Sequence, residues 1–360
     1  MFPENLKIVI VAGGTGGHIY PGIALAEELR ARWPKSQIIF IGSREGLEKE
    51  LIPQAGFPIK YIWARALLRK LSYKAVSAPF IAFVGFWQAL YTLATLRPKL
   101  VLTTGGYTSL PVLLAARFLG IKTYMHEQNV LPGVTNRLAS RLTSQVFLSF
   151  AESTKYMAGK VVGNPVRQAI LQADRQSARK NLGLQADELL ILILGGSQGA
   201  RTINQTVIQS LPAIGQLRAK FRLLHALGHR DAALSSWRLP AGKYPFYQPV
   251  EYLYNIAEAL AAADLVVSRA GATAIAEFAA RGLPMILIPF PFSAEGHQDL
   301  NADAVVAAGA GIKVANVEFT PTFFVDLLKD ISKMNLDNMR LNCRALARPQ
   351  AAREIVDALI

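Results

Sequence analysis

The chain alternates short apolar runs with longer amphipathic stretches, which is the pattern of parallel strands joined by crossover helices. In the first half, strands are predicted over 6–11, 37–41, 59–63, 100–104, 121–126 and 146–148. The helices predicted between them cover 21–32, 45–55, 75–96, 110–118 and 132–140. The pattern restarts after residues 161–165, with strands at 189–194, 221–226, 265–268, 284–288 and 312–314 and helices at 200–214, 273–281 and 296–308. Two such arrays predict two doubly wound parallel sheets of the α/β class.

The length agrees with two domains, because 360 residues exceed what one ordinary hydrophobic core organises. We expect an N-terminal domain over 1–164 and a C-terminal domain over 165–339. From the pattern alone, the last helices, about 338–360, could belong to either domain.

Three short glycine loops stand where a predicted strand runs into a predicted helix. They are Gly13-Gly14-Thr15-Gly16-Gly17-His18, Gly105-Gly106-Tyr107 and Gly195-Gly196-Ser197-Gln198-Gly199. A glycine turn at the start of a helix exposes backbone N–H groups that bind phosphate. Because two loops lie in one half of the chain and the third in the other, they suggest that phosphates are held from two sides.

Several common phosphate-binding enzymes do not fit these loops. Ile19 stands where the dinucleotide motif needs its last glycine, and Gly42-Ser43-Arg44 follows the second strand where a ribose-binding acid is expected. No lysine followed by serine or threonine closes a glycine loop, and no Asp-x-Asp occurs. We therefore disfavour a dehydrogenase, a P-loop NTPase and a metal-clamped nucleotide-sugar site, and we expect no cofactor and no metal. Backbone amides, helix dipoles and groups such as Ser197 and Arg167 would then stabilise a leaving diphosphate.

Charge is distributed unevenly along the chain. Residues 1–160 hold 19 Lys and Arg against 8 Asp and Glu, a net +11 out of +14 for the whole chain. Nucleic acid, an anionic membrane surface or an anionic substrate would each explain this charge, as would a merely solvated basic face. The single cysteine, Cys343, and an N-terminus without signal-peptide features lead us to expect a cytoplasmic protein.

Two polar positions are candidates for proton transfer. His18 ends the first glycine loop, and histidine exchanges protons near neutral pH, so it could accept the proton of an attacking hydroxyl. Glu127, in the run His126-Glu127-Gln128-Asn129 at a strand end, could orient or replace His18, and Asn129 could bind a sugar. A purely structural role for either site is the alternative.

Residues 75–96 form a stretch of 22 residues without a charged side chain. Its length could span a bilayer, but Pro79, Gly85 and Gln88 weaken that interpretation, and the segment fills the place of a crossover helix. A basic and aromatic group suits a helix lying on an anionic membrane surface. Its members are Arg65, Arg69, Lys70, Lys74, Phe80, Phe83, Phe86 and Trp87. An ordinary packed helix is the second alternative.

The motifs together resemble the MurG family of glycosyltransferases, in glycosyltransferase family 28. The resemblance runs in order from about residue 6 to 310 and rests on the three glycine loops, Pro21-Gly22, His126-Glu127-Gln128-Asn129, Gly163-Asn164-Pro165-Val166-Arg167, Ser268-Arg269-Ala270-Gly271-Ala272 through Glu277, and His297-Gln298 with Asn301-Ala302. It implies the GT-B fold, two Rossmann-like domains facing across a cleft, with a C-terminal helix about 340–360 crossing back to the first domain.

The resemblance also implies roles for particular residues. Glu277 would accept the ribose hydroxyls of UDP, the backbone at Leu253 would read the uracil, and Gln298 would contact the donor sugar. The full expected donor set is Thr15, Gly16, Gly17, Asn129, Arg167, Ser197, Leu253, Ala272, Thr273, Ala274, Ile275, Ala276, Glu277, Gln298 and Asn301. The acceptor diphosphate is expected at Gly13, Gly14, Gly105, Gly106 and Tyr107.

The implied activity is inverting transfer of N-acetylglucosamine from UDP-N-acetylglucosamine to the muramyl C4 hydroxyl of lipid I, giving lipid II for peptidoglycan. His18 or Glu127 would be the base. The expected location is the cytoplasmic face of the plasma membrane, held peripherally, with no nucleic-acid partner. Two alternatives stay open: a related enzyme acting on diacylglycerol, and a non-enzymatic nucleotide-binding module.

Overall fold

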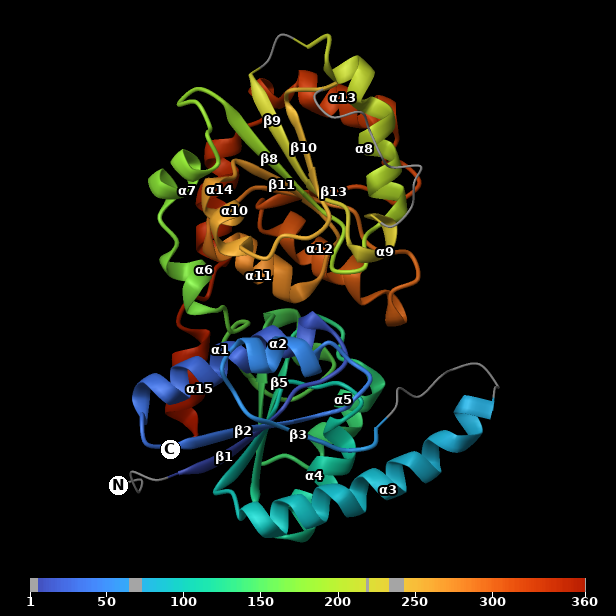
Figure 1. Ribbon diagram of the computed structural model, residues 1–360, viewed down its shortest axis with the longest axis vertical. Helices are drawn as coiled ribbons and strands as arrows, with labels where there is room; N and C mark the ends of the chain where they lie inside the picture. The colour runs from blue at the N-terminus through green and yellow to red at the C-terminus, as the bar shows by residue number, and fades with distance from the viewer. Residues whose placement is uncertain (1–5, 65–72, 218–219, 233–242, 360) are drawn as a thin grey trace. The chain divides into compact units, whose positions relative to one another are not determined.

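The computed structural model describes residues 6–64, 73–217, 220–232 and 243–359 (Figure 1). The chain divides into two compact units. The first is Met1–Gln168 with Arg348–Ile360, and the second is Ala169–Ala347. Each is built on one parallel sheet, as the alternating pattern predicts.

The first unit holds a seven-stranded sheet in the order β3-β2-β1-β4-β5-β6-β7. The strands are β1 Lys7–Val11, β2 Gln37–Gly42, β3 Ile59–Tyr61, β4 Leu100–Thr103, β5 Lys122–Glu127, β6 Gln145–Leu148 and β7 Lys160–Val161. All neighbours are parallel, and Val9 on central β1 pairs with Ile39 and Val101. The carboxyl ends of β1, β4 and β5 therefore meet at one edge, where ligands of such sheets bind.

Helices cover both faces of this sheet (Figure 1). They are α1 Gly16–Arg32, α2 Glu48–Gln54, α3 Tyr73–Leu96, α4 Ser109–Phe118, α5 Val134–Ser140, the short 3₁₀ helix η1 Ala151–Lys155, and α15 Ala351–Ala358. The predicted helix start at residue 21 is wrong. Thr15 keeps an extended backbone, its carbonyl accepts from the N–H groups of His18 and Ile19, and the helix begins at Gly16. His18 consequently lies in the first turn of α1.

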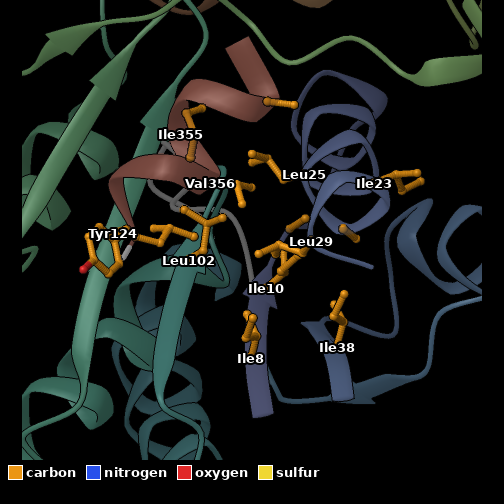
Figure 2. Packing of buried hydrophobic residues seen from close by; sticks show 14 of the residues in the cluster. Ile8, Ile10, Ile23, Leu25, Leu29, Ile38, Leu102, Tyr124, Ile355 and Val356 are labelled. Atoms are coloured by element: carbon orange, nitrogen blue, oxygen red, sulfur yellow. The ribbon is translucent and has the colours of Figure 1, made fainter. Parts of the chain in front are cut away.

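Alternate residues of β1 pack into different cores. Ile8 and Ile10 lie in a cluster with α1 and α15, whereas Val9 and Val11 lie in a second cluster with α3 and α4. Figure 2 shows the first cluster, in which residues of α15 pack beside α1 and the strands. A strand buried on both faces reads as a continuous apolar run, which is why the central strands were readable from the sequence.

The second unit holds a six-stranded parallel sheet in the order β10-β9-β8-β11-β12-β13. The strands are β8 Leu189–Leu194, β9 Phe221–Ala226, β10 Tyr247–Val250, β11 Leu265–Ser268, β12 Met285–Leu287 and β13 Gly311–Lys313. β10 was not predicted. It is an edge strand carrying Pro249, which lacks the N–H of a central strand, and its pattern is correspondingly weak.

The helices of the second unit are α6 Gln168–Gln172, α7 Arg175–Asn181, α8 Arg201–Ile214, α9 His229–Ala232, α10 Ile256–Ala262, α11 Ala272–Ala280, η3 Ala294–Gly296, α12 His297–Ala307, α13 Pro321–Lys329, η4 Ile331–Lys333 and α14 Leu336–Leu346. The helices α8, α11 and α12 were predicted, whereas α6, α7, α9, α10 and α13 were not. In place of one helix over 340–360, the chain ends in α14, which packs on α11, and α15, which packs on α1. Of these two helices, α15 lies in the first unit and α14 in the second.

Candidate active site

The first two glycine loops lie against each other in the first unit, at the carboxyl ends of β1 and β4. Gly106 has φ +93°, and a Cβ placed on it would lie 2.5 Å from the carbonyl oxygen of Gly13. Since real Cβ atoms do not approach so closely, both the positive φ and the contact require glycine at position 106. The two loops expected at the acceptor diphosphate are thus in direct backbone contact at Gly13 and Gly106.

A buried carboxylate that the sequence analysis missed holds this structure. Glu48 accepts from Gly14 N at 2.9 Å through Oε2, and from Ser43 N at 2.8 Å and Ser43 Oγ at 2.7 Å through Oε1. Ser43 Oγ also lies 2.9 Å from Tyr107 OH. The pKa of Tyr107 is raised, mainly because the hydroxyl is buried. This hydroxyl therefore stays protonated and available as a donor. Glu48 thereby links the first loop directly and the second through Ser43.

His18 is anchored through one ring nitrogen. Its Nδ1 lies 2.9 Å from the carbonyl oxygen of Thr104 and 3.0 Å from Oε1 of Gln128. Both partners are oxygen acceptors, so Nδ1 carries a hydrogen, and in the neutral ring Nε2 is then the proton acceptor. His18 is half-buried, and its ring hydrogen bonds to the described residues are made through Nδ1.

Glu127 ends β5 and is fully buried. Its Oε1 accepts from the backbone N–H of Asn129 at 2.9 Å and from Asn129 Nδ2 at 3.3 Å, and its Oε2 accepts from Asn136 Nδ2 at 2.6 Å. A Cβ on Gly105 would lie 2.7 Å from Asn136 Nδ2 and 3.1 Å from His18 Nδ1. The glycine therefore lets the Glu127–Asn136 pair and His18 approach each other.

The donor residues expected from the N-terminal half lie nearby on the same unit. Thr15, Gly16 and Gly17 start α1. The Arg167 guanidinium lies over the Tyr20 ring at 3.9 Å from its centroid, in the first unit. Tyr20 is on α1, two residues after His18, so Arg167 is held close to the turn that carries the candidate base.

The third glycine loop joins β8 to α8 in the second unit. The Ser197 carbonyl accepts from the N–H of His229 at 3.2 Å. Gly228, which sequence reasoning missed, has φ +85°, and a Cβ on it would lie 2.1 Å from Gly199 N. Gly228 follows β9, so the carboxyl ends of β8 and β9 meet through glycine backbones, as β1 and β4 do in the first unit.

The other expected donor residues gather around α11. Glu277 and Thr273 are buried on this helix, which begins at Ala272 after Gly271. Asn301 is fully buried and donates through Nδ2 to the carbonyl of Ala270 at 3.1 Å. Gln298 Oε1 accepts from the N–H of Phe290 at 2.9 Å. Ala274, Ile275 and Ala276 complete the turn before Glu277, and Leu253 follows β10. Asn301 thus fixes the loop before α11, and Gln298 fixes the loop after β12.

Metal-ligating side chains do not cluster in the part of the chain that the structure describes. No group of three or more His, Cys, Asp or Glu there could hold a metal ion.

Helix α3 packs with one face and exposes another. Ala89 and Leu93 are buried, and a Cβ on Gly85 would lie 2.1 Å from the carbonyl oxygen of Trp63. Gln88 Oε1 accepts from the Trp63 N–H at 2.7 Å. Gly85 and Gln88 therefore seat the helix on the chain that follows β3.

The opposite face of α3 is aromatic. Phe83 is 60% exposed, Trp87 54% and Tyr91 76%, at helical spacing of four residues, and Phe118 at the end of neighbouring α4 is 75% exposed. Arg65, Arg69 and Lys70 lie outside the described residues, as do the side chains of Lys74 and Phe80. Among the helices described, none is long and apolar enough to cross a membrane.

The whole chain matches known glycosyltransferases. Residues 8–148 match the glycosyltransferase family 28 N-terminal domain, and residues 190–359 match the glycosyltransferase family 28 C-terminal domain. A UDP-N-acetylglucosamine–N-acetylmuramyl-(pentapeptide) pyrophosphoryl-undecaprenol N-acetylglucosamine transferase of Desulforamulus reducens is 39% identical over 98% of this chain and 97% of its own. The transferase of the same name from Caldicellulosiruptor saccharolyticus is 38% identical over 98% and 96%. The crystal structure of Acinetobacter baumannii MurG has a TM-score of 0.75 at 29% identity, covering 98% of this chain and 99% of that chain.

Two parallel-sheet units with these matches define a glycosyltransferase of the GT-B fold, as predicted. The chain belongs to glycosyltransferase family 28 and, within it, to the MurG family. The non-enzymatic alternative is thereby set aside.

Proposed function

We propose that this enzyme transfers N-acetylglucosamine from UDP-N-acetylglucosamine to the C4 hydroxyl of the muramyl sugar of lipid I, giving lipid II. The observation that carries the proposal is the 39% identity over nearly the full length of a relative named for a UDP-N-acetylglucosamine donor and an undecaprenyl-pyrophosphoryl muramyl acceptor. Because the donor linkage is α and the product linkage β, a single displacement accounts for the inversion.

We assign the base to His18. Its Nε2 is the acceptor end of a ring anchored through Nδ1, whereas both oxygens of buried Glu127 are already engaged by Asn129 and Asn136. In this assignment the acceptor hydroxyl gives its proton to His18 Nε2 as its oxygen attacks the anomeric carbon, and UDP leaves. Glu127 orders Asn129 and Asn136 beside the base and does not take the proton itself.

The N-terminal domain, over 1–164, is assigned to the acceptor. The N–H groups of Gly14 and Gly105 are engaged by Glu48 and by Thr103 Oγ1. We assign the diphosphate to the amides of Gly13 and Gly106 and to the start of α1 at Gly16. The N-terminus of a helix of 17 residues such as α1 favours an anion near Gly16.

The C-terminal domain, over 165–339, is assigned to the donor. Glu277 on α11 would accept the ribose hydroxyls, and the loop carrying Ser197 at the start of α8 would bind the diphosphate of UDP. Arg167, although it lies in the first compact unit, would neutralise charge that develops on the leaving diphosphate.

Replacing Glu277 by alanine should weaken UDP-N-acetylglucosamine binding by about 1–3 kcal/mol, because hydrogen bonds to a carboxylate are lost. Calorimetric titration with UDP measures the change. Glu318→Ala, which removes an exposed carboxylate of the same unit, is the control and should bind UDP as the unchanged enzyme does. Unaltered UDP affinity in folded Glu277→Ala protein would reject the ribose assignment.

We also propose peripheral attachment to the cytoplasmic face of the plasma membrane through the aromatic face of α3. The acceptor's polyprenyl tail stays in the bilayer, so the enzyme must work at its surface. The net +11 of residues 1–160 supports an anionic surface, where each cation contributes about 1 kcal/mol that salt weakens.

Changing Phe83, Trp87 and Tyr91 together to serine should lower vesicle binding at least about tenfold, since each exposed aromatic that enters the interface adds apolar burial. Flotation with anionic and neutral vesicles, at low and high salt, measures it. Phe292→Ser, at a side chain 83% exposed on the second unit, is the control. Equal flotation of triple variant and control would remove α3 from the membrane contact.

The acceptor is tested by incubating the enzyme with radiolabelled UDP-N-acetylglucosamine and lipid I, diacylglycerol or no lipid. Label transferred to lipid I supports the proposal. Label on diacylglycerol instead would favour the related lipid glycosyltransferase.

A further inference from the structure

A chain of hydrogen bonds runs through the first unit from a backbone carbonyl to the candidate base. His126 Nε2 lies 3.0 Å from the Gly163 oxygen, and Gln128 Nε2 lies 3.0 Å from His126 Nδ1. Gln128 Oε1 in turn lies 3.0 Å from His18 Nδ1. His126 and Gln128 are both buried. Neither has a part in the mechanism as derived so far, yet they connect β5 and the Gly163 turn to the first turn of α1.

The hydrogen bond between His126 and the Gly163 oxygen fixes which group donates and which accepts along this series. A carbonyl oxygen only accepts, so His126 Nε2 carries the hydrogen. Burial lowers the pKa of His126 to about 4, and this residue is therefore a neutral imidazole at physiological pH. With one hydrogen on Nε2, its Nδ1 is an acceptor, and the Gln128 group that faces it must be the NH₂.

A second contact fixes the Gln128 amide independently. Gln128 Nε2 lies 2.8 Å from the Thr104 oxygen, and the reversed amide would set two oxygens against each other there. Oε1 therefore faces His18. Since Thr104 O and Gln128 Oε1 both accept from His18 Nδ1, the hydrogen of His18 is held on Nδ1 from two sides.

We propose that Gln128 and His126 are positioning residues that lock His18 in the Nδ1–H tautomer and so keep Nε2 as the proton acceptor. The use of Nε2 as the base rests on the proposed function, whereas the tautomer itself does not. When the acceptor hydroxyl transfers its proton to Nε2, the imidazolium keeps its Nδ1–H bonded to the same two oxygens. No proton moves along Gln128 or His126 in this step.

The test is NMR of ¹⁵N-histidine-labelled enzyme without substrate, near pH 8. The chain has five histidines, so single substitutions assign the signals. We expect His18 with its hydrogen on Nδ1. Gln128→Met removes one of the two acceptors and should lower the ratio of the Nδ1–H to the Nε2–H form about tenfold, the effect of one hydrogen bond. Turnover should fall in step with the fraction of enzyme in the Nδ1–H form, with the donor KM unchanged.

His126 is tested by a matched pair. His126→Asn keeps an acceptor near the Nδ1 position and should preserve the His18 tautomer. His126→Leu leaves the Gln128 amide held by the Thr104 oxygen, so it should shift the tautomer in the same direction as Gln128→Met but by less. Tyr247→Phe is the control, because it removes a hydrogen bond to another buried histidine, His225, in the second unit. It should leave His18 unchanged.

His18 with its hydrogen on Nε2 in the unaltered enzyme, or an unchanged tautomer ratio in folded Gln128→Met, would overturn the proposal. If Gln128→Met does not fold, the unaltered enzyme and the His126 pair decide the matter. Because the spectra need no substrate, an Nδ1–H tautomer in an enzyme that leaves lipid I unmodified would refute the proposed function and leave the lock intact.

Discussion

Replacing His18 by asparagine should lower turnover of lipid I by about 100-fold or more, the usual effect of losing a general base, with donor affinity within about twofold. Asparagine is the sharpest substitution here, because its Nδ2 can still donate to Thr104 O and Gln128 Oε1. The packing of the first turn of α1 is then retained, and only the acceptor at Nε2 is lost.

Single-turnover kinetics with saturating donor, alongside calorimetry with UDP, separates the two effects. His18→Ala should show a loss of similar size. If His18→Asn keeps turnover within a few-fold of the unaltered enzyme, His18 has a structural role, and Glu127 becomes the leading candidate for the base.

Replacing Glu48 by alanine should reduce the free energy of unfolding by about 3 kcal/mol or more, since two buried donors on Ser43 and a half-buried donor on Gly14 lose their partner. The loop that ends in His18 loses its anchor at Gly14, so turnover should fall as well. Glu48→Gln retains the volume and one acceptor oxygen and should cost less.

Urea unfolding of the variants measures the change through the midpoint and slope. Glu50→Ala removes an exposed carboxylate from the same helix, α2, and should stay within about 0.5 kcal/mol of the unaltered enzyme. An unchanged midpoint for Glu48→Ala would mean that the Gly14 and Ser43 donors find other partners, and that Glu48 does not hold the loops.

The sequence was most informative where burial requires a simple run of apolar residues. Central strands such as β1 and β8 are apolar on both faces, so their position and the two-sheet fold could be predicted from the chain alone. The glycine loops were equally readable, because the turn from strand to helix restricts the residue type. The match to family 28 confirms the glycosyltransferase class.

The polar network of the candidate site could not be predicted, because it depends on contacts between residues distant in the chain. His18 and Gln128 are 110 residues apart, and Glu48 and Gly14 are 34 apart. The sequence did hold a weak signal for Glu48. Residues 1–160 contain only 8 acidic side chains, and Glu48 is one that follows closely on a predicted strand. Edge strand β10 was missed for a different reason, since Pro249 and its partial exposure blur the pattern.

The linkage in the product tests the account's central claim most directly. Enzyme incubated with UDP-N-acetylglucosamine and lipid I should give a lipid-linked disaccharide whose new sugar is joined to the muramyl O4, and proton NMR of the released disaccharide should show the anomeric coupling of a β linkage. An α linkage, attachment at another oxygen, or transfer only to a different lipid would contradict inverting transfer to the C4 hydroxyl.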